Sequence, residues 1–403
     1  MAGRISVDEH AAFVRSLLAG LGARPTERVA LADALGRITA SPVESPIPLP
    51  PFRNSQMDGF AVRAVDVADA PVTLPIAGEV AAAAGTPAPL APGTAVRIMT
   101  GAAVPDGADA IVPVEDTEPD GEGEPGVDGV RILRARTAGA FVREAGSDLV
   151  AGADVLPPGL RLASRHLAAA AASGLTELLV REHVRVAVVS TGSELVEPGA
   201  PLGPGEIPDA NGVALTSAAR AAGALVVHSG RVRDDVERLR AELDAAVDAG
   251  AELVVTSGGI SMGAYEVVRE LLEPLGAWVG SVAMQPGGPQ ATAGYRGMPV
   301  ICFPGNPVSA QLSFELFVAP ALRAIAGLPP ARTERLALAE DVRSVAGKRQ
   351  FLRGRRAADG RVEPVGGAGS HLVATLAASE LLIVVPEDVE ALDAGAIVDT
   401  VFL

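Results

Sequence analysis

Apolar and polar positions follow two different periods along this sequence of 403 residues. Between residues 184 and 327, apolar runs of strand length are followed by Gly-rich turns and then by segments with apolar residues three and four positions apart. The first pattern is typical of buried strands and the second of amphipathic helices. The strands are predicted within 184–192, 224–230, 252–259 and 298–307, and the helices at 212–222, 236–249, 264–276 and from 308 onward. This alternation predicts a parallel sheet covered by helices on both faces.

Two other stretches carry short β-branched runs separated by Pro and Gly, which predict small β domains. Segments 26–38 and 160–173 flank the first of them and are predicted to be helices that pack together, so the β domain is inserted into a helical stalk. The fold class is therefore multidomain, α/β plus β. The predicted domains are an N-terminal helix on the α/β domain (1–23), the stalk and dimerisation domain (24–44 and 138–178), the inserted β domain (45–137), the α/β domain (179–328) and a C-terminal β domain (329–403).

Composition argues against several classes of protein. The formal charge of −16 at pH 7 disfavours sequence-independent nucleic-acid binding, which depends on cations that neutralise phosphates. Cys302 is the single cysteine, so the chain can form no internal disulfide and no cysteine cluster for zinc or iron–sulfur. The apolar run 167–175 is too short to span a bilayer. We expect a protein of the reducing cytoplasm that binds neither nucleic acid nor membrane.

Polar and Gly-rich loops follow the predicted strands of the α/β segment. In an open parallel sheet such loops meet beyond the carboxyl ends of the strands, where ligands bind. Backbone N–H groups and hydroxyls in these loops suit phosphate or other oxyanions. The candidate substrate-binding residues are Ser190, Thr191, Gly192, Glu194, Ser257, Gly258, Gly259, Ser261, Pro304, Gly305 and Asn306.

Carboxylates stand among these oxyanion donors, at Glu194, Asp234, Asp235 and Glu266. Carboxylates beside phosphate donors indicate Mg²⁺, which takes oxygen ligands and bridges to substrate phosphates. Glu194, Asp234 and Glu266 are the candidate metal ligands. The alternative that Asp235 caps the following helix and that Glu194 and Glu266 are only solvated stays open.

Four motifs together resemble the molybdopterin molybdenumtransferase family, the group of MoeA and the gephyrin E domain. They are PPFRNSQMDGFAVR at 50–63, VRIMTGAAVPDGADAIV at 96–112, TSGGISMGAYE at 256–266 and CFPGNPVSA at 302–310. The resemblance implies a homodimer of four-domain subunits with a molybdopterin-binding type of three-layer α/β domain and a barrel-like C-terminal domain. It also implies a Mg²⁺-dependent reaction in which adenylylated molybdopterin is hydrolysed, molybdate is inserted into its dithiolene and AMP leaves.

The resemblance also implies site residues outside the α/β segment. In the family the cleft lies between the α/β domain of one subunit and the inserted β domain of the other, so Asp58, Thr100 and Ser370 would join it. Asp58, Thr100, Asp234 and Glu266 are then the candidate catalytic residues. Glu266 stands where many members have an aspartate, and it would act with one more methylene.

The segment VAMQPGGPQATAG at 282–294 departs most from the family. Its Pro-Gly turns bare backbone N–H groups, yet no Lys or Arg lies between Arg269 and Arg296. The family pattern resembles KPGKP, with two lysines facing the anionic substrate, and this chain has Gln285 and Gly288 at those positions. Gln285 remains a candidate substrate-binding residue through a neutral hydrogen bond. If restoring lysine at 285 and 288 brought no gain in activity, other groups such as Arg269 or Arg296 would have taken over the role of the lysines.

Two alternatives therefore stay open beside the molybdenum-insertion enzyme. The first is a catalytically weak paralogue that binds the pterin nucleotide or acts as the structural partner of an active, lysine-bearing homologue. The second is a molybdopterin adenylyltransferase, since the α/β domain resembles that enzyme. A separate molybdopterin adenylyltransferase is also a candidate partner of this chain. The inserted β domain with its MDGF motif at 57–60 argues against the second alternative.

Overall fold

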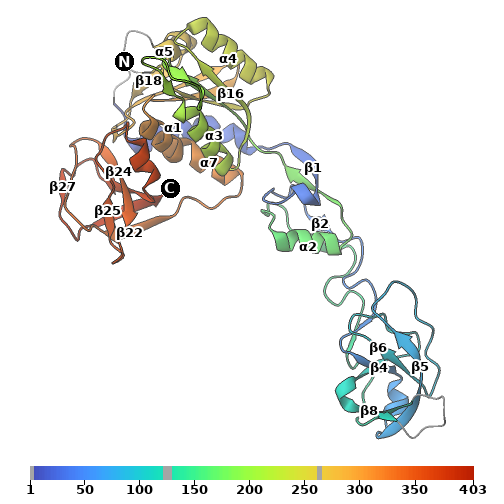
Figure 1. Ribbon diagram of the computed structural model, residues 1–403. Coiled ribbons are helices and arrows are strands. Elements are labelled where there is room, and N and C mark those ends of the chain that lie inside the picture. The colour runs from blue at the N-terminus through green and yellow to red at the C-terminus, as the bar shows by residue number, and fades with distance from the viewer. Residues whose placement is uncertain (1–3, 121–128, 261–265) are drawn as a thin grey trace. The chain divides into compact units, whose positions relative to one another are not determined.

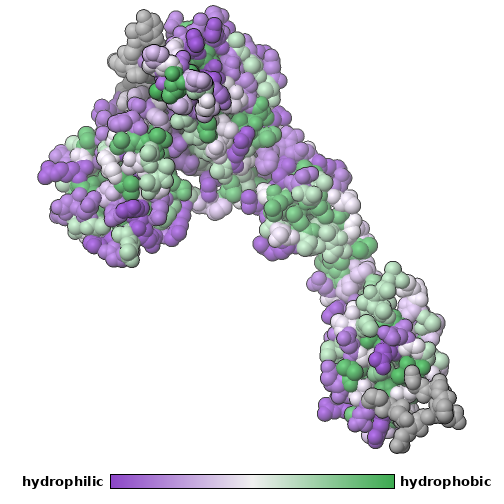
Figure 2. All heavy atoms as spheres, in the orientation of Figure 1, coloured by the Kyte–Doolittle hydropathy of each residue, from purple (hydrophilic) through white to green (hydrophobic). Residues whose placement is uncertain are grey.

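The computed structural model describes residues 4–120, 129–260 and 266–403. The chain divides into two compact units (Figure 1). One contains the N-terminal segment up to Glu27 and Arg181–Leu403, and the other is Arg28–Val180. Hydrophilic and hydrophobic residues are interspersed over the visible surface of both units (Figure 2).

The first unit contains a six-stranded sheet with the order β16-β13-β17-β21-β20-β18. Its parallel strands are β16 (Leu225–Val232), β13 (Arg185–Thr191), β17 (Leu253–Ser257) and β21 (Met298–Phe303). They agree with the four strands predicted from apolar runs. β13, β17 and β21 are almost wholly buried because helices cover both faces, while in the edge strand β16 only Val232 is buried.

The prediction of a wholly parallel sheet is wrong at one edge. There β20 (Pro289–Tyr295) and β18 (Trp278–Ser281) are antiparallel to their neighbours. Tyr295 pairs with Met298, so only Arg296 and Gly297 connect β20 to β21, with φ of 50° and 84°. Two central residues with positive φ form the tight turn that matches the twist of an antiparallel hairpin. Arg-Gly between two apolar runs was the signal for this hairpin.

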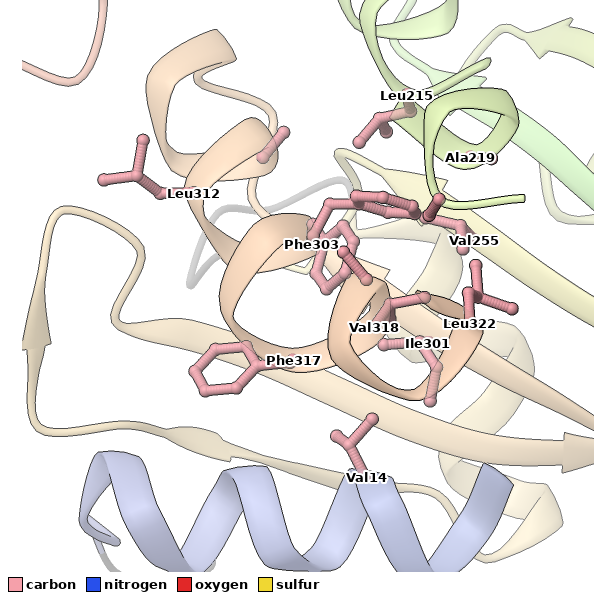
Figure 3. Packing of buried hydrophobic residues seen from close by; sticks show 14 of the residues in the cluster. Val14, Leu215, Ala219, Val255, Ile301, Phe303, Leu312, Phe317, Val318 and Leu322 are labelled. Carbon is pink, nitrogen blue, oxygen red and sulfur yellow. The ribbon is translucent and has the colours of Figure 1, made fainter. Parts of the chain in front are cut away.

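Helices cover both faces of this sheet. One face is covered by α1 (Val7–Leu18), α3 (Ala210–Ala221), α6 (Pro307–Ser313), a π-helical turn η6 (Phe314–Val318) and α7 (Ala319–Ile325). The other face is covered by α4 (Val236–Asp248) and α5 (Val267–Leu272). Figure 3 shows Val14 of α1 directed toward the cluster that holds Phe317, Val318 and Ile301. The predicted N-terminal helix therefore packs on the α/β domain.

The helical run Pro307–Ile325 is the one stretch of the described residues that is long and apolar enough to cross a membrane by length and composition. Of its most apolar window, 56% is buried inside the protein. Leu312, Phe314 and Leu322 belong to the core on the sheet, so the apolar character of this run is explained by its packing.

The C-terminal part forms a second sheet with the order β19-β24-β26-β28-β22, and β25 pairs with β24. Its strands are β22 (Thr333–Ala337), β24 (Arg349–Arg356), β25 (Val362–Pro364), β26 (Leu381–Val385) and β28 (Ile397–Phe402). Short elements complete this part, namely the paired β23 (Val342–Arg343) and β27 (Ala391–Leu392) and the helix α8 (Val373–Ala377).

The edge strand β19 (Met284–Gln285) comes from the segment 282–294 of the α/β domain. It pairs in parallel with β24, with Met284 opposite Arg349 and Gln285 opposite Gln350. The Arg349 N–H also donates to the Ala283 carbonyl at 2.8 Å. The loop that lacks cations is therefore held partly by the C-terminal sheet.

The second unit contains a six-stranded sheet with the order β7-β4-β6-β5-β9-β8. Its strands are β4 (Gly59–Val62), β5 (Val72–Val80), β6 (Ala95–Ile98), β7 (Ala110–Pro113), β8 (Thr117–Asp120) and β9 (Gly129–Ile132). This is the β structure that the short apolar runs predicted. Further short pairs in the chain are β3 (Asn54–Ser55) with β10 (Val142–Arg143), and β14 (Leu195–Val196) with β15 (Ile207–Pro208).

The predicted helical stalk is wrong in its secondary structure. Segment 26–38 contains the strand β1 (Thr26–Ala30) and a short 3₁₀ turn, η2 (Leu31–Asp33). Strand β1 pairs with β12 (Glu177–Arg181), and β2 (Val43–Glu44) pairs with β11 (Asp154–Leu156). Only α2 (Ser164–Ala172) is helical, and in it only Ala170 is buried. Pairing with a strand about 150 residues away overrides the weak local helix propensity of segment 26–38.

Candidate active site

A cavity of about 1000 Å³ lies at the carboxyl ends of the parallel strands. Its wall is formed by the loops that follow β13, β16, β17 and β21, by residues 284–289 and by the C-terminal segment 368–371. All of these elements belong to the first unit. The cavity is therefore where the sequence predicted that the loops of a parallel sheet would meet.

Most of the predicted substrate-binding and metal-binding residues line this cavity. They are Thr191, Gly192, Glu194, Asp234, Gly258, Gly259, Glu266, Gln285, Pro304, Gly305, Asn306 and Ser370. Ser190 and Ser257 do not line it, because both are buried behind the wall with their Oγ atoms 3.4 Å apart. Ser261 lies outside the described residues.

Two glycines allow the loop after β17 to pass close to the loop after β13. Gly258 and Gly259 have φ of 90° and 67°, which side chains disfavour. A Cβ atom on Gly258 would lie 2.4 Å from the Thr191 carbonyl oxygen. Glycine at 258 is therefore required by the close approach of two backbones at the cavity wall.

The acidic residues of the cavity differ in their surroundings. Asp234 accepts from the Ser193 N–H at 3.0 Å, while its own N–H donates to Ser193 Oγ, so the two loops are bound to each other. Glu194 is exposed, and Glu266 is half-buried at the start of α5. Asp235 accepts from the Arg238 N–H at 2.9 Å and caps α4, as the structural alternative for that residue predicted.

Within the described part of the chain, no three His, Cys, Asp or Glu side chains are grouped as a ready-made metal site. Mg²⁺ is usually held by one or two carboxylates together with substrate phosphates and water, and not by an all-protein cage. Separate carboxylates at Glu194, Asp234 and Glu266 around one open cavity fit that mode of binding.

The loop 285–289 carries polar groups but no charge. Gln285 Oε1 accepts from Gln350 Nε2 at 2.8 Å, which leaves its own amide N–H groups as donors. Neither arginine suggested as a replacement lines the cavity. Arg269 pairs with Glu273 at 3.1 Å and Arg296 with Asp244 at 3.0 Å. Their positions therefore do not support the alternative that one of them has taken over the role of the lysines.

Several residues that line or support the cavity wall were missed by the sequence reasoning. Asn211 Nδ2 donates to the Gly305 carbonyl at 2.8 Å and so braces the loop after β21. Buried Arg353 donates to the carbonyls of Gly367 and Gly369, and so positions the segment that bears Ser370. Lys348 also lines the cavity, and it is the single lysine of the sequence. Its being the single lysine was the one feature of the sequence that could have drawn attention to it.

Asp58 and Thr100 lie in the second unit, and the structure brings them together. The Thr100 N–H and Oγ1 donate to Asp58 Oδ1 at 2.6 and 2.7 Å. These two hydrogen bonds, the backbone one foremost, lower the pKa of Asp58 below its ordinary value. The pair therefore presents an exposed and firmly ionised carboxylate on the β sheet.

Comparison with known proteins covers nearly the whole chain. Residues 5–174 match the MoeA N-terminal region (domain I and II), 187–324 match a probable molybdopterin binding domain and 335–403 match the MoeA C-terminal region (domain IV). The chain is 45% identical over 408 residues to molybdopterin molybdenumtransferase 2 of Mycobacterium tuberculosis (strain CDC 1551 / Oshkosh), with 97% of each chain covered. The chain belongs to the MoeA family of molybdopterin molybdenumtransferases.

Other members of the MoeA family are similar over their full lengths. Molybdopterin molybdenumtransferase 1 of the same organism is 36% identical, with 99% of both chains covered. A crystal structure of the molybdopterin biosynthesis MoeA protein from Pyrococcus horikosii matches with a TM-score of 0.80 and 32% identity, with 99% of both chains covered. The molybdopterin-binding match contains the loops after the parallel strands, while Lys348 and Ser370 fall in the C-terminal MoeA match.

Proposed function

We propose that this chain, an enzyme of molybdenum cofactor biosynthesis, inserts molybdate into adenylylated molybdopterin and releases AMP in a Mg²⁺-dependent reaction. The observation that carries the proposal is the cavity of about 1000 Å³ with carboxylates and Gly-rich loops at the carboxyl ends of the strands. Its size is at the upper end for small-molecule sites, as a pterin joined to a nucleotide requires.

Each group in the wall has a role that its position supports. Glu194, Asp234 and Glu266 would hold Mg²⁺ together with substrate phosphate oxygens. A bound Mg²⁺ supplies neutralisation of phosphate charge and polarisation of a phosphorus–oxygen bond. The glycines at 258 and 259 let backbone groups approach the substrate, and Arg353 holds the Ser370 segment in place. Asp58 lies in the second unit and not in this wall. We assign it as a further catalytic group on the resemblance of its motif to the family, and Thr100 keeps it ionised.

A homodimer is part of this proposal. The described surface of the second unit carries large exposed apolar side chains, among them Leu35 at 64% and Val150 at 62% exposure. The visible surface over β1, β2 and α2 includes hydrophobic residues (Figure 2). Apolar surface of this kind is often covered in an assembly. Sedimentation at micromolar concentration is expected to give a dimer, and a monomer would contradict this part. The cytoplasmic location remains a prediction.

The test of the function is AMP release from adenylylated molybdopterin in the presence of molybdate and Mg²⁺. Asp234→Ala and Glu266→Ala are expected to lower turnover by orders of magnitude with little change in melting temperature, because a ligand in an open cleft contributes little to the core. Glu237→Ala, which removes an exposed carboxylate on α4, is the matched control. Absence of AMP release by the wild type would contradict the proposal.

A catalytically weak paralogue remains the second candidate, and the uncharged loop 285–289 favours it. Tight binding of the pterin nucleotide without turnover, restored when a lysine-bearing homologue is added, would support this candidate. For this candidate, Gln285→Lys with Gly288→Lys would also raise turnover, because the two lysines restore positive charge to the loop. The loop can accept a side chain at 288, since a Cβ on Gly288 would meet no atom closer than 3.5 Å. The adenylyltransferase alternative loses its basis because the chain matches the N-terminal and C-terminal MoeA regions as well.

A further inference from the structure

The cavity is strongly biased toward negative charge. Four carboxylate residues line it, namely Glu194, Asp209, Asp234 and Glu266. Lys348 is the one Lys or Arg among the described residues that line it, and His371 is the one histidine. An anionic ligand therefore meets a single permanent side-chain cation in this wall.

Lys348 enters the cavity from the C-terminal domain. It precedes β24, whose first residues pair with β19, and β19 leads directly into the loop 286–289. The backbone bonds between Arg349 and Ala283 and the side-chain bond between Gln350 and Gln285 hold this junction in register. The pairing of β19 with β24 therefore fixes the backbone at Lys348 beside the uncharged loop.

The neighbouring arginines are committed to protein partners. Arg349 makes paired hydrogen bonds with Asp8 at 2.8 and 2.9 Å and also binds Glu387. Arg353 is buried and donates to backbone carbonyls. Lys348, in contrast, is half-buried and has no carboxylate within salt-bridge distance in the described part of the chain. Its ammonium group, with three N–H donors, is available to a ligand.

We propose that the Lys348 ammonium binds the oxyanion part of the substrate, a phosphate or molybdate oxygen, and is the cation of this cavity. The inference rests on the proposed function and extends it by assigning a substrate-binding residue in the C-terminal domain. A charge-assisted hydrogen bond in a partly dehydrated cleft is expected to change affinity at least about tenfold.

The experiment measures AMP release as a function of molybdate concentration, and the dissociation constant of AMP by calorimetry, on the full-length protein. Lys348→Met removes the charge and keeps the length of the side chain, Lys348→Arg keeps the charge, and Arg343→Met removes an exposed charge of the same domain outside the cavity. Melting temperatures of all variants confirm that they are folded.

We expect Lys348→Met to raise the molybdate KM or the AMP dissociation constant at least about tenfold, Lys348→Arg to recover most of the loss, and Arg343→Met to match the wild type. If Lys348→Met raises only the molybdate KM, Lys348 binds the molybdate. If it raises the AMP dissociation constant, Lys348 binds the phosphate. If the wild type is active and a folded Lys348→Met has the same molybdate KM and the same AMP dissociation constant as Arg343→Met, the assignment of Lys348 is wrong while the proposed function stands. A wild type that neither releases nor binds AMP overturns the proposed function and the inference with it.

Discussion

Gly258 is the position at which the architecture of the cavity can be tested by one methyl group. Its φ is 90°, and a Cβ atom would lie 2.4 Å from the Thr191 carbonyl oxygen and 2.7 Å from Thr191 Oγ1. The left-handed backbone costs an L-residue about 1–2 kcal/mol. Forced displacement of a packed neighbour adds about 1–3 kcal/mol. Gly258→Ala should therefore reduce the free energy of unfolding by about 2–5 kcal/mol.

Gly276→Ala provides the matched control. Gly276 has φ 85°, but no atom lies within 4 Å of its added Cβ. The free energy of unfolding of this variant should therefore fall only by the backbone cost of about 1–2 kcal/mol. Trp278 is the single tryptophan and lies in β18, so its fluorescence follows unfolding of this unit in guanidinium chloride. In a thermal scan each kcal/mol corresponds to about 2–4 °C for a domain of 150–250 residues. Equal losses in the two variants would refute the close approach of the two loops.

Two further predictions concern pH. Burial against Trp278 and Phe317 lowers the pKa of His10 to about 4, while the unfolded value is near 6.5, so stability is unaffected above about pH 6.5. The free energy of unfolding should fall by about 1.4 kcal/mol for each unit by which the pH is lowered from 6.5 to 4. In guanidinium titrations at several pH values, His10→Phe should flatten this slope. An unchanged slope would count against the burial of a neutral imidazole. In Thr100→Val the pKa of Asp58 should rise toward its ordinary value, because the Oγ1 donor at 2.7 Å is lost while the backbone donor remains. NMR titration of the Asp58 carboxyl checks this, and an identical pKa in both proteins would show that the hydroxyl is not a partner in solution.

The parts of the fold that could be predicted are those in which local pattern and tertiary environment agree. Strands β13 and β17 are mostly apolar and almost wholly buried because helices cover both faces, and α4 begins where Asp235 provides a cap. Segment 26–38 has no such agreement, since its secondary structure depends on a partner at 177–181. A single sequence contains no signal for a pairing at that distance.

The same distinction applies to the site. Loop residues that follow predicted strands, such as Glu194 and Asp234, could be assigned because every parallel strand delivers its loop to the same edge. Lys348 could not, because it reaches the cavity through the pairing of β19 with β24, which joins segments about 65 residues apart in different domains. Arg269 and Arg296 flank the uncharged loop in the sequence, yet neither lines the cavity, whereas the more distant Lys348 does.

The shared strand β19 makes the C-terminal domain the carrier of the positive charge of the cavity. If homologues exchange this domain by recombination, the recipient acquires the donor's residue at position 348 together with the edge that receives β19. A chimera would thus inherit its affinity for anions from one parent and its acidic loops from the other. Removal of the domain would instead leave the edge of Met284 and Gln285 unpaired, and exposed edges of this kind recruit other chains into aggregates. The charge balance of the site and the solubility of the α/β domain are therefore inherited together.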